Sequence, residues 1–92
     1  MRLRGRTDAN QKALRTHAEA LGASFVSLAN LGEGCSDAML GWRGETFLVE
    51  FKTEKGYLTE QQRQFNRRWQ GGKVHVVRTE ADLERLLLGK TL

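Results

Sequence analysis

Apolar residues near the start of the chain recur at intervals of three or four positions, which is typical of a helix with one buried face. These residues are Ala13, Leu14, Ala18 and Leu21. Gly22 follows as a natural end, and Asp8 with Gln11 fits a capping box at the beginning. The pattern predicts a helix over residues 8–21.

Two further helices are expected in the second half of the chain. The first covers residues 59–69, with Thr59 as its N-cap and the glycines at 71–72 as its end. The second follows Thr79, which is also suited to cap a helix. Its buried face is expected to contain Leu83, Leu86 and Leu87.

Short runs of β-branched and aromatic residues predict four strands between these helices. They span residues 24–28, 37–42, 45–52 and 73–77. A polar loop with Gly32 and Gly34 precedes the second strand, and another polar loop over 53–57 follows the third. The glycine pair opens no helix, so no dinucleotide loop is expected. No organic cofactor is expected either.

The second and third predicted strands are separated only by residues 43–44, Arg-Gly, which indicates an antiparallel hairpin. If Trp42 opposes Glu45 across a two-residue turn, Asp37 opposes Glu50 further along. Opposed side chains point to the same face, with Cβ atoms about 4.5–5.5 Å apart. A bulge at the glycine of the turn would shift this pairing by one residue.

The predicted order of elements is αβββαβα, which defines an α/β fold with a mixed sheet of about four strands flanked by helices. The hairpin is expected in the middle of the sheet. A length of 92 residues suits one domain, with a basic arm over residues 1–7. Because a domain this small has a modest core, pairing into a homodimer is expected.

Charge narrows the choice of partner. The net charge is +4, and arginines gather in the 1–7 arm and over residues 63–68. This balance favours a polyanion, with nucleic acid ahead of a membrane surface. The chain has no long apolar run and no signal-peptide pattern, so no membrane association is expected. The lone Cys35 suits a reducing cytoplasm.

The third predicted strand places an acid and a lysine on one face, because Glu50 and Lys52 alternate with apolar residues. The hairpin register adds Asp37 beside Glu50. Two carboxylates this close repel each other, and a divalent cation between them removes the repulsion. Mg²⁺ or Mn²⁺ would bind these oxygens, and Lys52 would stabilise charge on a reacting phosphate. The alternative is an ordinary surface ion pair, with Asp37 as a turn residue.

Three segments carry a family resemblance, namely residues 34–37 (GCSD), 41–44 (GWRG) and 49–52 (VEFK). Together they resemble the signature of the PD-(D/E)xK nucleases, and in particular the short VRR-NUC nucleases of phages and bacteria. The resemblance extends over about residues 8–88 and implies a restriction-endonuclease-like core in a single domain. Ser36 stands where this family usually has proline.

The resemblance implies a role for each matched residue. Asp37 and Glu50 would hold Mg²⁺ or Mn²⁺, with the Phe51 carbonyl as a third ligand. Lys52 would be the catalytic lysine.

Members of this family also use an acid on the first helix and a glutamine on the helix after the lysine. By motif position these fall on Asp8 and Gln62. Asp8 is equally well explained as a helix cap, and Glu19 is a second candidate for the helical acid. Gln62 has the spacing of a capping-box partner of Thr59, although it is expected on the inward face of its helix.

Basic residues near this site are expected to contact DNA phosphates, which position the substrate without reading its sequence. They are Arg63, Arg67 and Lys55, together with Arg4 and Arg6 of the arm. The expected function is a metal-dependent DNA endonuclease in the cytoplasm of a bacterial or phage-infected cell. Branched DNA such as Holliday junctions is the expected substrate, and a homodimer would supply two symmetric nicks. The alternatives are a non-catalytic nucleic-acid-binding module and a restriction-like or RNA-cutting nuclease.

Overall fold

The structure, a computed structural model, describes residues 8–89 of the chain. Within that range the helices are α1 (Asp8–Leu21), α2 (Glu60–Arg68) and α3 (Glu80–Leu87), and the strands are β1 (Ser24–Ser27), β2 (Ala38–Trp42), β3 (Glu45–Phe51) and β4 (Val74–Val77). This order, αβββαβα, is the order that the sequence predicts. None of these helices is long and apolar enough to cross a membrane.

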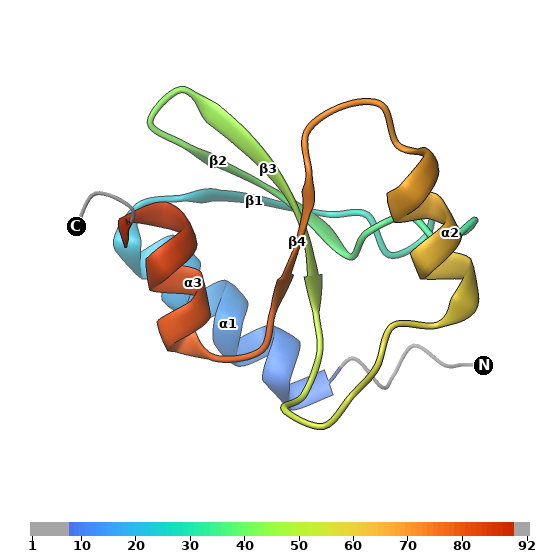
Figure 1. Ribbon diagram of the computed structural model, residues 1–92. Helices are drawn as coiled ribbons and strands as arrows, with labels where there is room; N and C mark the ends of the chain where they lie inside the picture. The colour runs from blue at the N-terminus through green and yellow to red at the C-terminus, as the bar shows by residue number, and fades with distance from the viewer. Residues whose placement is uncertain (1–7, 90–92) are drawn as a thin grey trace.

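The strands form one mixed sheet in the order β1-β2-β3-β4. β2 pairs antiparallel with both β1 and β3, whereas β3 and β4 are parallel and are connected through α2. The predicted α/β class is confirmed, with the β2–β3 hairpin in the middle of the sheet. Figure 1 shows α1 and α3 together on one side of the sheet and α2 alone on the other.

The hairpin turn has the geometry of a tight two-residue connection. Its residues, 43–44, both have positive φ angles, 47° and 85°, which is characteristic of a type I′ turn. Trp42 therefore opposes Glu45, and the same register continues to the pair of Ala38 and Val49. The predicted register is confirmed along β2, without a one-residue shift at the turn.

The strand pairing changes just before β2 begins. The backbone N–H of Asp37 donates to the carbonyl of Val49 over 3.0 Å, although Val49 already opposes Ala38. Two residues thus face one partner, as in a β-bulge. The Asp37 carbonyl in turn accepts a hydrogen bond of 2.8 Å from Leu28, which ties the end of β1 to the same point. The expected direct opposition of Asp37 and Glu50 is therefore wrong, because the bulge interrupts the ladder there.

One face of the sheet encloses the main hydrophobic core with α1 and α3. The buried members of this core are Leu14, Ala18, Ala23, Ala38, Leu40, Val49, Phe51, Val77, Leu83 and Leu87. Leu86, expected in the core, is only partly buried and packs against it. Because side chains alternate along a strand, Glu50 points to the opposite face from Val49 and Phe51. That opposite face is the one that α2 covers.

Candidate metal site

The candidate site centres on Glu50, a carboxylate buried beneath α2. Its relative exposure is 0%, and neither carboxylate oxygen has a hydrogen-bond partner among residues 8–89. An ionised carboxylate in this position has lost its hydration without gaining a donor, which destabilises the charged form. Buried charges in proteins are normally paired or bound to a metal.

The surroundings of Glu50 act on its pKa in both directions. Burial is the largest influence and raises the pKa of Glu50 above its ordinary value of 4.5. The neighbouring Asn66 side chain lowers this pKa. The charge of Asp37 raises it, and the Lys52 ammonium lowers it. Asn66 is close to Glu50 without completing a well-formed hydrogen bond, since both Glu50 oxygens and the Asn66 Oδ1 are left without a partner. Burial is the dominant influence, so the pKa of Glu50 is raised overall.

Asp37 reaches the end of β3 through a hydrogen bond to the backbone. Its Oδ2 accepts a bond of 2.8 Å from the N–H of Phe51, the residue between Glu50 and Lys52. The negative charge of Asp37 raises the pKa of Glu50. The two carboxylates therefore lie near each other despite the bulge. The Phe51 peptide, whose carbonyl is the expected third ligand, is held beside the Asp37 carboxylate.

The beginning of α1 lies beside Lys52. The Asn10 side chain donates to the Lys52 carbonyl over 3.1 Å, and the Lys52 N–H donates to the Val77 carbonyl over 3.1 Å. A hollow of about 240 Å³ opens here, with Gln11, Lys52 and Tyr57 among its lining residues. The lysine therefore lines a solvent-accessible recess between α1 and the loop after β3.

Position along α1 separates the two candidates for the helical acid. Asp8 is the first residue of the helix, at the end that meets Lys52, and its side chain lies outside the described residues. Glu19 is about 16 Å further along the helix axis at 1.5 Å per residue. There it pairs with Arg15 over 3.2 Å, and both side chains are 48% exposed. Glu19 therefore lies away from the site.

On α2 the side chain that acts on Glu50 is that of Asn66. The Gln62 Oε1 accepts a bond of 3.0 Å from the Thr59 N–H, and the Gln62 N–H donates to Thr59 Oγ1 over 3.1 Å. Gln62 thus completes the capping box that the sequence offers as an alternative. Asn66 follows one turn later, and its spacing of four residues from Gln62 is the only sequence signal for its position.

The loop before Asp37 determines how closely α2 approaches the sheet. Gly34 has a φ of 77°, and a Cβ built there would lie 2.8 Å from the carbonyl carbon of Gln61. Only glycine avoids this overlap, so the loop and the first turn of α2 are in backbone contact. Ser36, which stands where the nucleases that the sequence resembles usually have proline, is 1% exposed, and its Oγ has no hydrogen-bond partner among the described residues.

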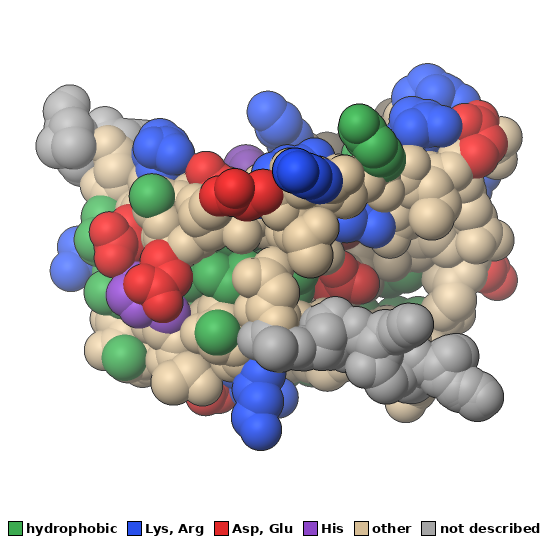
Figure 2. Space-filling model, turned by 90° about the horizontal axis from the view of Figure 1, so that it is seen from below, with side chains coloured by type: hydrophobic (Ala, Val, Ile, Leu, Met, Phe, Trp, Pro, Cys, Tyr) green, Lys and Arg blue, Asp and Glu red, His purple; other side chains and the backbone are tan. Residues whose placement is uncertain are grey.

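The basic residues expected to contact DNA are partly engaged within the protein. Arg63 pairs with the Glu60 carboxylate over 3.0 Å, and Arg67 lies 3.9 Å from the same carboxylate. Lys55 is exposed in the loop after β3. Two further candidates, Arg4 and Arg6, lie outside the described residues. On the face in Figure 2, basic side chains are interspersed with acidic ones and do not merge into one patch.

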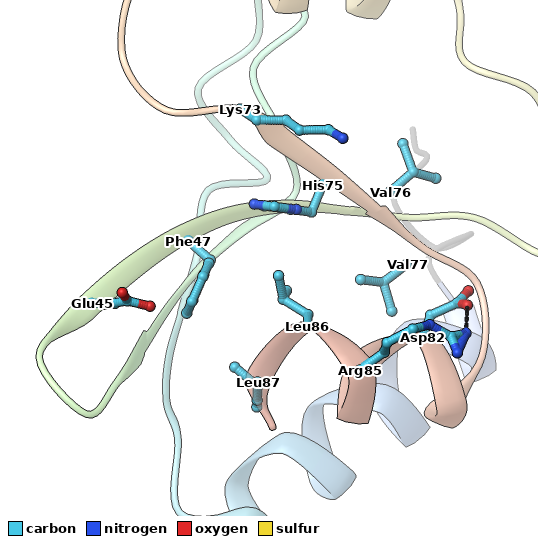
Figure 3. Close-up of a pocket in the computed structure, with 10 residues that line it drawn as sticks. All are labelled: Glu45, Phe47, Lys73, His75, Val76, Val77, Asp82, Arg85, Leu86 and Leu87. Atoms are coloured by element: carbon cyan, nitrogen blue, oxygen red, sulfur yellow. Dashed lines mark hydrogen bonds and ion pairs between the residues drawn. The ribbon is translucent and has the colours of Figure 1, made fainter. Parts of the chain in front are cut away.

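A wider groove of about 570 Å³ lies between β3, β4 and α3. Figure 3 shows Phe47 and His75 close together in it, with ring centroids 5.7 Å apart. Asp82 and Arg85 form an ion pair of 3.0 Å at its edge. None of the described residues that line this groove is a buried acid without a partner. The groove therefore offers no second site of the kind found at Glu50.

The atoms around Glu50 fit a hard divalent cation. Carboxylate and carbonyl oxygens, as in Asp37, Glu50 and Phe51, are the ligands that Mg²⁺ and Mn²⁺ prefer. Within residues 8–89, no three His, Cys, Asp or Glu side chains come together to hold a metal. The charged ligands at this site would therefore be the two carboxylates of Asp37 and Glu50. The unpartnered Glu50 oxygens are the observation in favour of an ion here.

Comparisons of the chain with protein-family models, with curated proteins and with solved structures found no match. Inference about function therefore depends on the geometry and chemistry around Glu50.

Proposed function

We propose that this protein is a metal-dependent endonuclease of the PD-(D/E)xK type, similar to the VRR-NUC nucleases, that hydrolyses DNA phosphodiester bonds. One observation carries the proposal: the Glu50 carboxylate is fully buried and unpartnered, next to the charge of Asp37 and close to Lys52. A carboxylate with a purely structural role is normally exposed or hydrogen-bonded. A carboxylate that binds a cation needs neither.

The residues of the site have separate tasks in this proposal. Asp37, Glu50 and the Phe51 carbonyl would hold Mg²⁺ or Mn²⁺, which supplies Lewis-acid chemistry and a more acidic bound water. Lys52, in the recess beside α1, would position the attacking water or offset charge that develops on the phosphate. The Phe51 N–H fixes the Asp37 carboxylate over 2.8 Å, so that this ligand is oriented before substrate binds.

We propose branched DNA, with Holliday junctions as the first case, as the substrate. A chain of 92 residues with a Cα radius of gyration of 12.7 Å has room for one such site. Cutting a junction symmetrically needs two sites, which a two-fold homodimer supplies. The reaction is assigned to the cytoplasm of a bacterial or phage-infected cell, without an organic cofactor or a membrane partner.

The direct test is cleavage of a labelled four-way junction in Mg²⁺ or Mn²⁺, with linear duplex and RNA alongside. The wild-type protein is expected to cut the junction. Asp37→Asn and Glu50→Gln are expected to bind the junction and to cut it below detection, because each removes a charged metal ligand. Glu45→Gln is the matched control, since it changes an exposed acid at the other end of the same strand and should leave cutting intact.

Each other outcome points to a different function. If the wild-type protein binds the junction and cuts nothing in either metal, the chain is a non-catalytic binding module. If it cuts linear duplex or RNA in preference to the junction, it is a nuclease and the branched substrate is wrong.

A further inference from the structure

α2 contributes one polar side chain to the buried surface around Glu50. No residue of α2 is fully buried, yet the Oδ1 atom of Asn66 is buried and has no hydrogen-bond partner within residues 8–89. Buried side-chain atoms in this condition are few in the described part of the chain. They are both carboxylate oxygens of Glu50, the Asn66 Oδ1 and the Ser36 Oγ, next to Asp37.

When Glu50 is ionised, its oxygens and the Asn66 Oδ1 cannot satisfy each other. An ionised carboxylate and a carboxamide oxygen are both acceptors, and neither has a proton to donate. Buried acceptor atoms without a partner on two neighbouring side chains are unfavourable unless a donor or a cation lies close to them. Side-chain amide oxygens of Asn are also ordinary ligands of hard divalent cations.

We propose that Asn66 supplies a further oxygen ligand to the divalent cation held by Asp37 and Glu50, an inference that rests on the proposed function. The site then joins three parts of the fold, which are the bulge before β2, the end of β3 and the last turn of α2. The two carboxylates balance the charge of the ion, and the neutral amide adds a ligand without adding negative charge. An anionic phosphate can therefore still approach.

Two substitutions at Asn66 separate a ligand from a packing residue. Asn66→Ala removes the amide oxygen and introduces alanine, which has high helix propensity, so the helix itself is not weakened. Asn66→Asp keeps the shape of the side chain and replaces the amide with a stronger oxygen ligand. Gln64→Ala is the matched control on the same helix, because the Gln64 amide donates to Glu60 over 3.3 Å on the exposed face.

The measurement is Mn²⁺ binding without DNA, by calorimetry and by the electron paramagnetic resonance signal of the bound ion. The wild-type protein and Gln64→Ala should bind Mn²⁺ alike, and Asn66→Ala should bind it about 10–100-fold more weakly. Asn66→Asp should bind at least as tightly as wild type. Its melting temperature should rise further on adding Mn²⁺, because three close carboxylates repel one another in the metal-free protein.

The outcomes that count against the inference are distinct from those that count against the nuclease. If Asn66→Ala binds Mn²⁺ like wild type while Asp37→Asn does not bind, the metal site stands and Asn66 is no ligand. If the Ala and Asp variants weaken binding equally, Asn66 has only a structural role and the inference fails. If the wild-type protein binds no Mn²⁺, both this inference and the proposed function fail.

Discussion

Burial of Glu50 couples its protonation to the stability of the protein. Burial raises the pKa of Glu50 above its ordinary value of 4.5, so the folded protein keeps this proton to higher pH than the unfolded chain does. The stabilising contribution of this proton is fully present below pH 4.5 and is lost as the pH rises through the folded pKa. A divalent cation would replace the proton as the compensating charge.

Glu50→Gln tests this coupling, because it keeps the shape of the side chain and removes the titration. We expect the metal-free variant to be at least as stable as wild type near neutral pH, since a buried unpaired charge is no longer required. Urea unfolding at a series of pH values above 4.5 measures the effect. Glu45→Gln, at an exposed position, should follow the wild-type profile. A Glu50→Gln profile with the wild-type pH dependence would show that Glu50 does not titrate in this way.

The residues of the site differ in how far the sequence predicts their positions. Glu50 and Lys52 follow from strand alternation, which is a local rule. The bulge at Asp37 does not, because it depends on backbone hydrogen bonds to Leu28 and Val49, which come from two other segments. Asn66 does not either, because its place beside Glu50 depends on how α2 docks.

At the scale of elements, α2 is held differently from the other helices. α1 and α3 bury leucines in the main core, whereas α2 has no fully buried residue. Its aromatic residues, Phe65 and Trp69, stack on each other with centroids 5.4 Å apart, and Trp69 stays 46% exposed. The close approach at Gly34 is therefore an important part of the docking of α2.

Two glycines in the same loop allow this docking contact to be tested. Gly32 and Gly34 have φ angles of 74° and 77°, but only at Gly34 would a Cβ meet another segment, at Gln61. Gly32→Ala should cost about 1–2 kcal/mol in free energy of unfolding, because alanine is strained at positive φ. Gly34→Ala should cost clearly more and should also weaken Mn²⁺ binding, since α2 must move outward. Urea unfolding and calorimetry check both, and equal effects of the two substitutions would exclude the backbone contact as the cause.

The start of α3 gives a second test at this scale. The Asp82 carboxylate accepts backbone hydrogen bonds from Arg78 and Thr79, and the Arg78 bond is the largest influence that lowers the pKa of Asp82. A lowered carboxyl pKa stabilises the fold above the ordinary value of 3.8, and this contribution is lost as the pH falls below it. Asp82→Ala should therefore cost about 1 kcal/mol at neutral pH, with a difference from wild type that shrinks on acidification. Thermal unfolding at several pH values measures this.

Helix starts and the central hairpin are predictable because their signals are local. Thr59 and Thr79 each form a capping box with a residue three positions later, and the turn at residues 43–44 fixes the hairpin. The parallel pairing of β3 with β4 joins segments far apart in the chain. Its existence follows from the predicted βαβ order, but its register follows from packing.

At the scale of the whole molecule, the arrangement of charge limits how DNA can bind. The net charge is +4, yet Glu60 pairs with two of the arginines expected on the DNA path. We expect Glu60→Gln to strengthen binding to junction DNA, because Arg63 and Arg67 become free to contact phosphates.

We expect Arg63→Ala combined with Arg67→Ala to lower the slope of log affinity against log salt by about 2, since each phosphate contact contributes about 0.9. Fluorescence anisotropy in Ca²⁺ at several salt concentrations measures both, and an unchanged slope would exclude α2 from the DNA path.

The topology of the sheet also determines the order in which the molecule assembles. The β2–β3 hairpin joins neighbouring segments through a two-residue turn and can form within microseconds. β4 pairs with β3 only after the crossover from Phe51 to Val74 has closed, which is a slower, long-range step. Asp37 and Glu50 are thus near each other early in folding, and Asn66 joins them late. We expect Mn²⁺ to slow unfolding more than it accelerates refolding in stopped-flow experiments, because the complete set of proposed metal ligands comes together only after the transition state.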